Sequence, residues 1–132
     1  MIQLGFLLAM LAAPAGPTTQ TAILVADAEG VPARLHCAGT EPFWSVTIEG
    51  GEAVFETPEN QGPSAPRLAL EDTLTAQNRL GLWAFRMKSQ EGQESVAVVR
   101  AAACSDGMSD REYPYAVAFL HGEGELLDGC CE

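Results

Sequence analysis

Hydrophobic and polar residues alternate along several short segments of the chain. In 43–49 (FWSVTIE), tryptophan, valine and isoleucine occupy every second position, and 82–88 (LWAFRMK) repeats the pattern with tryptophan, phenylalanine and methionine. A period of two over about seven residues is typical of a strand that buries one face. The residues predicted to face the core are Trp44, Val46, Ile48, Trp83, Phe85 and Met87.

Glycine-rich turns separate these segments from further apolar runs. Gly50-Gly51 follows the first strand, and two residues that tolerate positive φ predict a hairpin to 52–57. Further strands are predicted at 67–77, 96–103, 115–120 and 126–130, with an exposed proline-rich loop at 58–66. Many short strands without an amphipathic helix predict an all-β antiparallel meander, closed as a small barrel or a compact sandwich.

The N-terminus has the pattern of a secretion signal. Residues 2–13 form an almost unbroken apolar run that is too short to span a bilayer, and Ala13-Pro14-Ala15 fits a cleavage site. The alternative is a buried N-terminal strand or helix. We expect a signal peptide at 1–15, a linker or arm at 16–33 and a single β domain at 34–132. The domain is expected in the periplasm or outside the cell, without a membrane span.

Four cysteines follow the apolar run, and an even number in an oxidising compartment predicts disulfides. They allow three pairings, among which the sequence alone does not decide. Adjacent Cys130 and Cys131 would point to opposite faces of a strand and take different partners. We favour Cys104–Cys130, which closes a loop of about 26 residues and contributes about 3–4 kcal/mol. Cys37 and Cys131 would then form a second pair.

The formal net charge of −11 limits the partners of the chain. Nucleic acid and anionic lipid carry phosphate charge and would be repelled. A basic protein in the cell envelope is compatible with this charge. The alternative is that acidity only keeps a secreted protein soluble.

The segment 37–44 (CAGTEPFW) enters the first predicted hairpin. Pro42 fixes its own φ and predicts an extended Glu41, while Phe43 and Trp44 point to opposite faces. A carboxylate beside two aromatic residues is expected to be partly buried and to need hydrogen-bond partners. Glu41 is therefore either a general acid or ligand contact, or a carboxylate that holds loop amides. We favour the second.

The segment 104–115 (CSDGMSDREYPY) concentrates turn-forming residues. The side chains of Asp106, Ser109 and Asp110 can bond nearby backbone N–H groups, and Pro114 favours an extended Tyr113 that restarts a strand. Met108 is predicted to be an apolar plug beneath this loop.

A soft-metal site, such as one for copper, is the alternative role of Met108. Its other ligands would be His36, His121 or free thiols. The chain shows no nucleophile motif and no zinc-ligand spacing, so we predict neither an enzyme nor a cofactor.

Together these segments resemble an uncharacterised family of small secreted proteins and lipoproteins of proteobacteria. Its members sometimes accompany META (HslJ-like) domains. The matching positions are Cys37, Gly39, Glu41, Pro42, Phe43, Trp44, Cys104, Asp106, Met108, Ser109, Tyr113, Pro114, Gly129 and Cys130. The resemblance implies a cell-envelope location and a META-like small barrel, but no established reaction. Cys131 is additional to the family pattern.

These observations favour a non-enzymatic binding or structural role. The segment around Glu41 and the loop of Met108 are expected to form one end of the barrel, with Glu41 bonded to the loop near Ser109. An inhibitor of a basic enzyme such as lysozyme and a soft-metal binder are the alternatives.

Overall fold

The structure of the chain, a computed structural model, describes residues 12–13, 16 and 30–132. The predicted signal peptide at 1–15 lies almost entirely outside the described residues, as does most of the predicted linker at 16–33. No helix among the described residues is long and apolar enough to cross a membrane.

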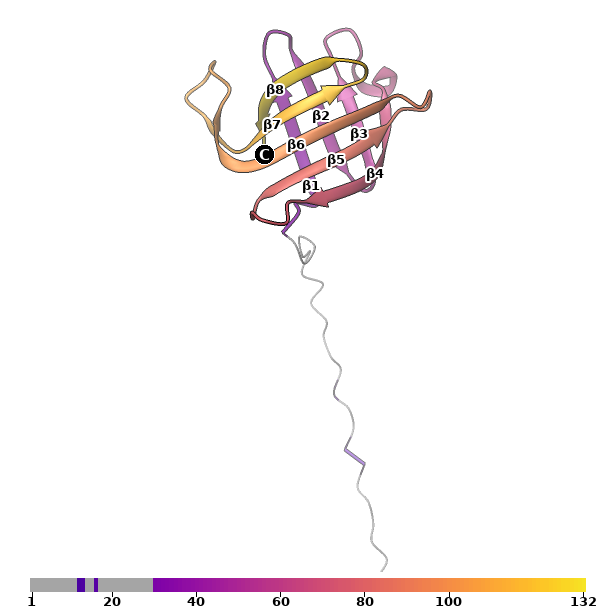
Figure 1. The fold of residues 1–132 in the computed structure, drawn as a ribbon, viewed down its shortest axis with the longest axis vertical. Helices are drawn as coiled ribbons and strands as arrows, with labels where there is room; N and C mark the ends of the chain where they lie inside the picture. Colours follow the sequence, from indigo (N-terminus) through magenta and orange to yellow (C-terminus); the bar gives the residue numbers. More distant parts are fainter. Residues whose placement is uncertain (1–11, 14–15, 17–29) are drawn as a thin grey trace, which may run out of the picture.

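Eight antiparallel strands form a closed barrel in which each strand pairs with the next along the chain and the last pairs with the first (Figure 1). The strands are β1 (Arg34–Gly39), β2 (Trp44–Glu49), β3 (Glu52–Glu56), β4 (Arg67–Thr75), β5 (Leu82–Lys88), β6 (Glu94–Ser105), β7 (Glu112–His121) and β8 (Glu125–Cys131). A short 3₁₀ helix, Gly62–Ser64, lies in the proline-rich loop between β3 and β4. The all-β antiparallel prediction is confirmed, and the barrel is the form it takes.

The barrel core is built from alternate residues of the strands. All six residues that the alternation placed inside are buried. Trp44 stacks against Phe119 with ring centroids 5.5 Å apart, and Phe55 lies 5.6 Å from Phe119. This apolar interior is the main stabilising element of so small a domain.

The sequence reasoning missed β1 as a strand. No strand is predicted at 34–39 (RLHCAG), and 37–44 is predicted to be the entry to a hairpin, but Leu35, Cys37 and Gly39 alternate inward like the other core residues. The alternation is short and ends in a small residue, so it gave a weak signal. β1 pairs with β2 along its whole length.

The seam between β1 and β8 closes the barrel over a short distance. Only Cys37↔Cys131 and Ala38↔Cys130 pair across it, and two backbone hydrogen bonds between His36 and Glu132 extend the ladder. The Cys37–Cys131 disulfide joins directly opposed residues of this seam. A second disulfide, Cys104–Cys130, ties β6 to β8.

Candidate binding cleft beside the barrel seam

A cleft of about 300 Å³ lies beside the seam, where β1 ends at Gly39 and β8 extends beyond it. We call it the seam cleft. Its walls come from the β1–β2 turn, from the start of the β6–β7 loop and from β8. The lining residues are Ala38, Gly39, Thr40, Glu41, Pro42, Trp44, Cys104, Ser105, Asp106, Leu126, Leu127, Asp128, Gly129 and Cys130.

The two segments that the sequence singled out meet at this cleft by an unexpected route. Successive turns of an antiparallel meander alternate between its ends, so the β1–β2 turn and the β6–β7 loop belong to opposite ends. The Cys104–Cys130 disulfide holds the β6–β7 hairpin against β8, which brings Asp106 into the same cleft as Glu41. They meet beside the seam, and not at one end of the barrel as we expected.

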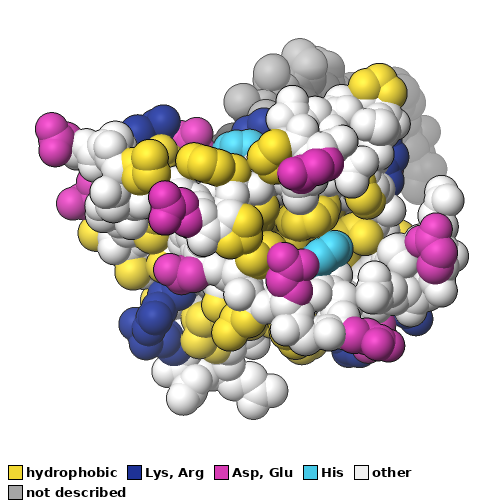
Figure 2. Space-filling view, turned by 90° about the horizontal axis from the view of Figure 1, so that it is seen from above, with side chains coloured by type: hydrophobic (Ala, Val, Ile, Leu, Met, Phe, Trp, Pro, Cys, Tyr) yellow, Lys and Arg dark blue, Asp and Glu magenta, His cyan; other side chains and the backbone are white. Residues whose placement is uncertain are grey.

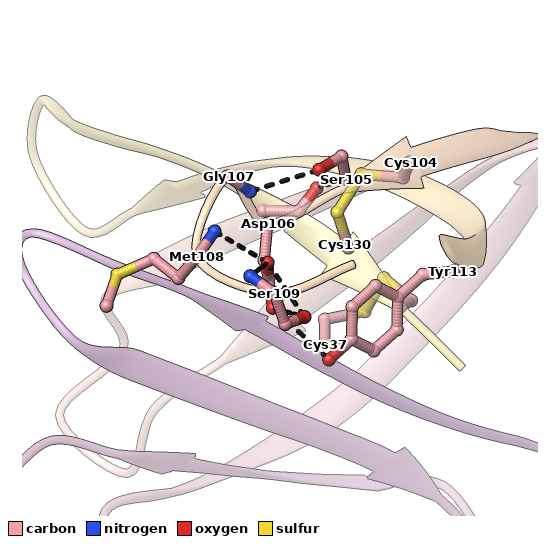
Figure 3. The surroundings of a disulfide bond; sticks show 11 residues. Cys37, Cys104, Ser105, Asp106, Gly107, Met108, Ser109, Tyr113 and Cys130 are labelled. Carbon is pink, nitrogen blue, oxygen red and sulfur yellow. Dashed lines mark hydrogen bonds between the residues drawn. A yellow bond between two sulfur atoms is a disulfide. The ribbon is translucent and has the colours of Figure 1, made fainter. Parts of the chain in front are cut away.

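Asp106 organises the β6–β7 loop (Figure 3). Its Oδ1 accepts hydrogen bonds from the backbone N–H groups of Met108 and Ser109, both at 2.9 Å. The Ser109 hydroxyl donates to the same carboxylate at 3.2 Å, and the Tyr113 hydroxyl lies 3.5 Å from Oδ2. The bond from the Met108 backbone, followed by that from Ser109, lowers the pKa of Asp106. The loop is thus self-bonded, as its Ser, Asp and Gly content predicted.

Arg111 fastens the far side of the loop. Its guanidinium pairs with the carboxylate of Glu132 and lies 4.6 Å from the ring centroid of Tyr113. Both contacts are at the surface, where each adds little to stability. The ion pair places the end of the loop, just before β7, beside the end of β8, because Glu132 follows the last residue of β8.

Two predictions for these segments are wrong. Met108 is 64% exposed, and its side chain points away from the disulfides in Figure 3, so it is not a plug beneath the loop. Its backbone N–H, and not its side chain, is what the loop uses. Asp110 makes no hydrogen bond among the described residues; Ser105, Asp106 and Ser109 accept the side-chain bonds from the loop amides.

Glu41 also differs from the expectation. It is exposed, its φ is +52° instead of extended, and no described residue bonds its carboxylate. The physical reason is the turn: Gly39 pairs with Trp44, so only four residues reverse the chain between β1 and β2. Phe43 is exposed and Trp44 is buried, as their opposite faces predicted. Asp106 holds loop amides as predicted, and Glu41 does not.

The close packing around Trp44 explains why positions 39 and 129 are glycines. A Cβ at Gly39 would lie 2.2 Å from Nε1 of Trp44, and a Cβ at Gly129 would lie 2.3 Å from the carbonyl oxygen of Ala38 and 3.0 Å from the Trp44 ring. Only glycine permits this close approach of β1, β8 and the indole. Gly39, Trp44 and Gly129 therefore shape the floor of the seam cleft.

The seam cleft is acidic. Glu41, Asp106 and Asp128 line it, and its lining contains no lysine, arginine or histidine. Among the described residues, no three His, Cys, Asp or Glu side chains converge closely enough to hold a metal ion. Figure 2 shows acidic side chains spread over one end of the molecule, with lysine and arginine towards its margin. The arrangement suits a cationic group larger than a single ion.

One edge of β8 contributes to the cleft. Its ladder with β1 covers Cys130 and Cys131, so Leu126–Asp128 have no strand partner on that side in the described part of the chain. An unpaired strand edge presents backbone N–H and C=O groups that an extended peptide can bond. Sequence reasoning missed this edge and Asp128, because strand pairing decides both.

The histidines and cysteines have structural partners. His36 Nδ1 lies 2.9 Å from the Thr47 hydroxyl. His121 stacks on Phe55 at 4.2 Å and lies 3.3 Å from Ser95 Oγ, and burial lowers its pKa despite the opposing effect of Glu125. All four cysteines are in disulfides, so the prediction of thiol ligands for a soft metal is wrong.

Comparison of the chain with protein-family models, with curated proteins and with solved structures finds no match.

Proposed function

We propose that the chain is an extracytoplasmic binding protein that holds a basic protein partner through the seam cleft. The observation that carries this proposal is the acidic lining of the cleft, with three carboxylates and no cationic side chain. Two disulfides fit an oxidising compartment, which supports a periplasmic or secreted location. The role is non-enzymatic, in keeping with the family resemblance.

The cleft offers a basic partner two kinds of contact. Glu41 and Asp128 are exposed and have no ion pair within the described chain, so they are free to meet a lysine or arginine side chain. The adjacent edge of β8 can bond the backbone of an extended segment of the partner. Asp106 is already held by its own loop and contributes charge.

The test is calorimetric titration of the chain with lysozyme as the basic probe, at low and at physiological salt. Glu41→Gln with Asp128→Asn removes two cleft charges but leaves the loop bonds of Asp106 intact. Glu91→Gln with Glu123→Gln is the matched control, because both residues are exposed turn acids outside the cleft and the net charge changes equally. We expect the cleft variant to bind about 10-fold or more weakly, and the control less than about 2-fold.

Equal weakening by the two double variants would show non-specific attraction to an acidic surface and would overturn the cleft as the site. An absence of binding even at low salt would reject lysozyme-like partners, including the alternative that the chain inhibits such an enzyme.

A further inference from the structure

The outer face of β5–β8 has an apolar centre of alanine, valine and leucine side chains, which is unusual for a barrel wall that faces water. Alternate residues of these strands bury their side chains in the core, and the residues between them point outwards. One outward row runs Ala84–Val98–Ala118–Asp128 across β5 to β8, and the next runs Arg86–Val96–Leu120–Leu126 across the same strands. Val98 is 42%, Leu120 44% and Leu126 71% exposed.

This face is also hollowed. A groove of about 280 Å³ runs over β7, where Ala116 and Ala118 are too small to fill the space between the neighbouring strands. Arg100 of β6 and Asp128 of β8 stand on opposite sides of it. Neither forms an ion pair within the described part of the chain. The groove thus has an apolar floor and one unpaired charge of each sign.

We propose that this face is a homodimer interface. A two-fold axis that lies in the interface along β7 sets β6 of each copy over β8 of the other. Such an axis keeps each outward row at its own level, so Val96 lies over Leu126 of the second copy and Leu120 lies close to Leu120 of the second copy. Arg100 lies one row from Asp128 of the second copy, close enough for its long side chain to approach the carboxylate. The face is therefore self-complementary in charge and in apolar contacts.

Charge favours a second copy over the other occupants. The chain carries a net charge of −11, so most of its surface repels a copy of itself and repels an anionic membrane. On this face, Arg86 is paired with Asp72, and Arg100 offsets Asp128, so the repulsion is locally absent. A basic partner on this face would meet Arg100. Asp128 borders both this face and the seam cleft, so a second copy and a basic partner in the cleft would compete for this carboxylate.

The test is sedimentation velocity of the oxidised chain over a range of concentrations. We expect a monomer–dimer equilibrium in the wild type. Val98→Asp places a second carboxylate in the outward row of Asp128 and should raise the dissociation constant about 10-fold or more. Val54→Asp is the matched control: Val54 points outwards from β3, opposite Arg67, and its substitution should leave the dissociation constant within about 2-fold.

A charge exchange tests the register. Arg100→Asp alone should weaken the dimer, and Arg100→Asp with Asp128→Arg should restore it. Thermal melting of each variant confirms that the barrel is folded. A wild type that stays monomeric at all concentrations, or a dimer that Val98→Asp leaves intact, would overturn the interface. A double exchange no stronger than the single variant would overturn the register.

Discussion

The two halves of the barrel wall are alike inside and different outside. Strands β1–β3 and β5–β8 both bury alternate residues in one core. Outside, β1–β3 carry mainly polar side chains. The ion pairs Arg34–Glu49 and Glu52–Arg67, the second with β4, are exposed to solvent. The outer face of β5–β8 carries alanine, valine and leucine at most of the outward positions, with Arg86, Arg100 and Asp128 at others.

Burial in the core alone therefore does not explain the sequence of this barrel. The inward pattern is required by the core and is the same in both halves. The outward pattern is free to vary, and a row of apolar residues there costs solubility unless another molecule covers it. The first half faces solvent, and the second half carries the outer surface that we propose as a homodimer interface.

The disulfide that joins the two halves should have the largest effect on stability. Cys37–Cys131 bridges 94 residues across the seam, whereas Cys104–Cys130 bridges 26 residues within the second half. Because loop entropy grows with length, Cys37→Ala with Cys131→Ala should cost about 4–5 kcal/mol, and Cys104→Ala with Cys130→Ala about 3–4. Denaturant unfolding of both variants measures this. A larger loss of stability for the variant at Cys104 and Cys130 would mean that the seam disulfide is not the one that stabilises the barrel more.

Leu126 and Leu127 are adjacent in β8, where Leu126 faces outwards and Leu127 faces the core. Leu127 is buried in the core, so Leu127→Ala should destabilise the barrel by about 2–4 kcal/mol. Leu126→Ala should change the stability of the monomer by less than about 0.5 kcal/mol. Unfolding at concentrations that favour the monomer gives both values. A large loss for Leu126→Ala there would show that it belongs to the fold and not to an interface.

A substitution at Gly39 tests how closely β1, β8 and Trp44 pack at the seam. An added methyl group would collide with Trp44 and with the backbone of Asp128, so Gly39→Ala should cost about 1–3 kcal/mol. The φ of Gly39 is not positive, so the cost is one of packing. Denaturant unfolding measures it, and the fluorescence of Trp44 should shift as its packing changes. A stable variant with unchanged emission would contradict the arrangement of the cleft floor.

His121 should give the smallest effect, and it depends on pH. Burial holds its folded pKa below the unfolded value of about 6.5, so the unfolded chain binds the proton more readily. The stabilisation is complete above that value and is lost as the pH falls through it. Thermal melting from pH 7.5 to 5 should show a steeper fall in Tm for the wild type than for His121→Phe. Parallel curves would contradict the burial of this side chain against Phe55.

Much of the fold could be predicted because it depends on local pattern. The inward faces at Trp44 and Trp83 and the hairpin at Gly50-Gly51 are encoded over a few residues each. β1 was missed because its apolar run is short. A closed barrel, in place of a sandwich, depends on pairing between β1 and β8 from the two ends of the domain.

The candidate site could be predicted only in part. The motifs that line it were identified, but the route by which they meet depends on a disulfide and on how the β6–β7 hairpin folds. Asp106 bonds the loop amides as predicted, but Glu41 does not, because local sequence does not say which carboxylate faces them. The apolar outer face was not predicted, since it is formed by residues of separate strands.

Carbene footprinting tests the contrast between the two halves most directly. The oxidised wild type would be labelled at a low and at a high protein concentration, and modified residues would be located by mass spectrometry. We expect the labelling of Val98, Leu120 and Leu126 to fall as the protein concentration rises. Val54, on the polar half, should be labelled equally at both concentrations. Unchanged labelling of all four residues would contradict it.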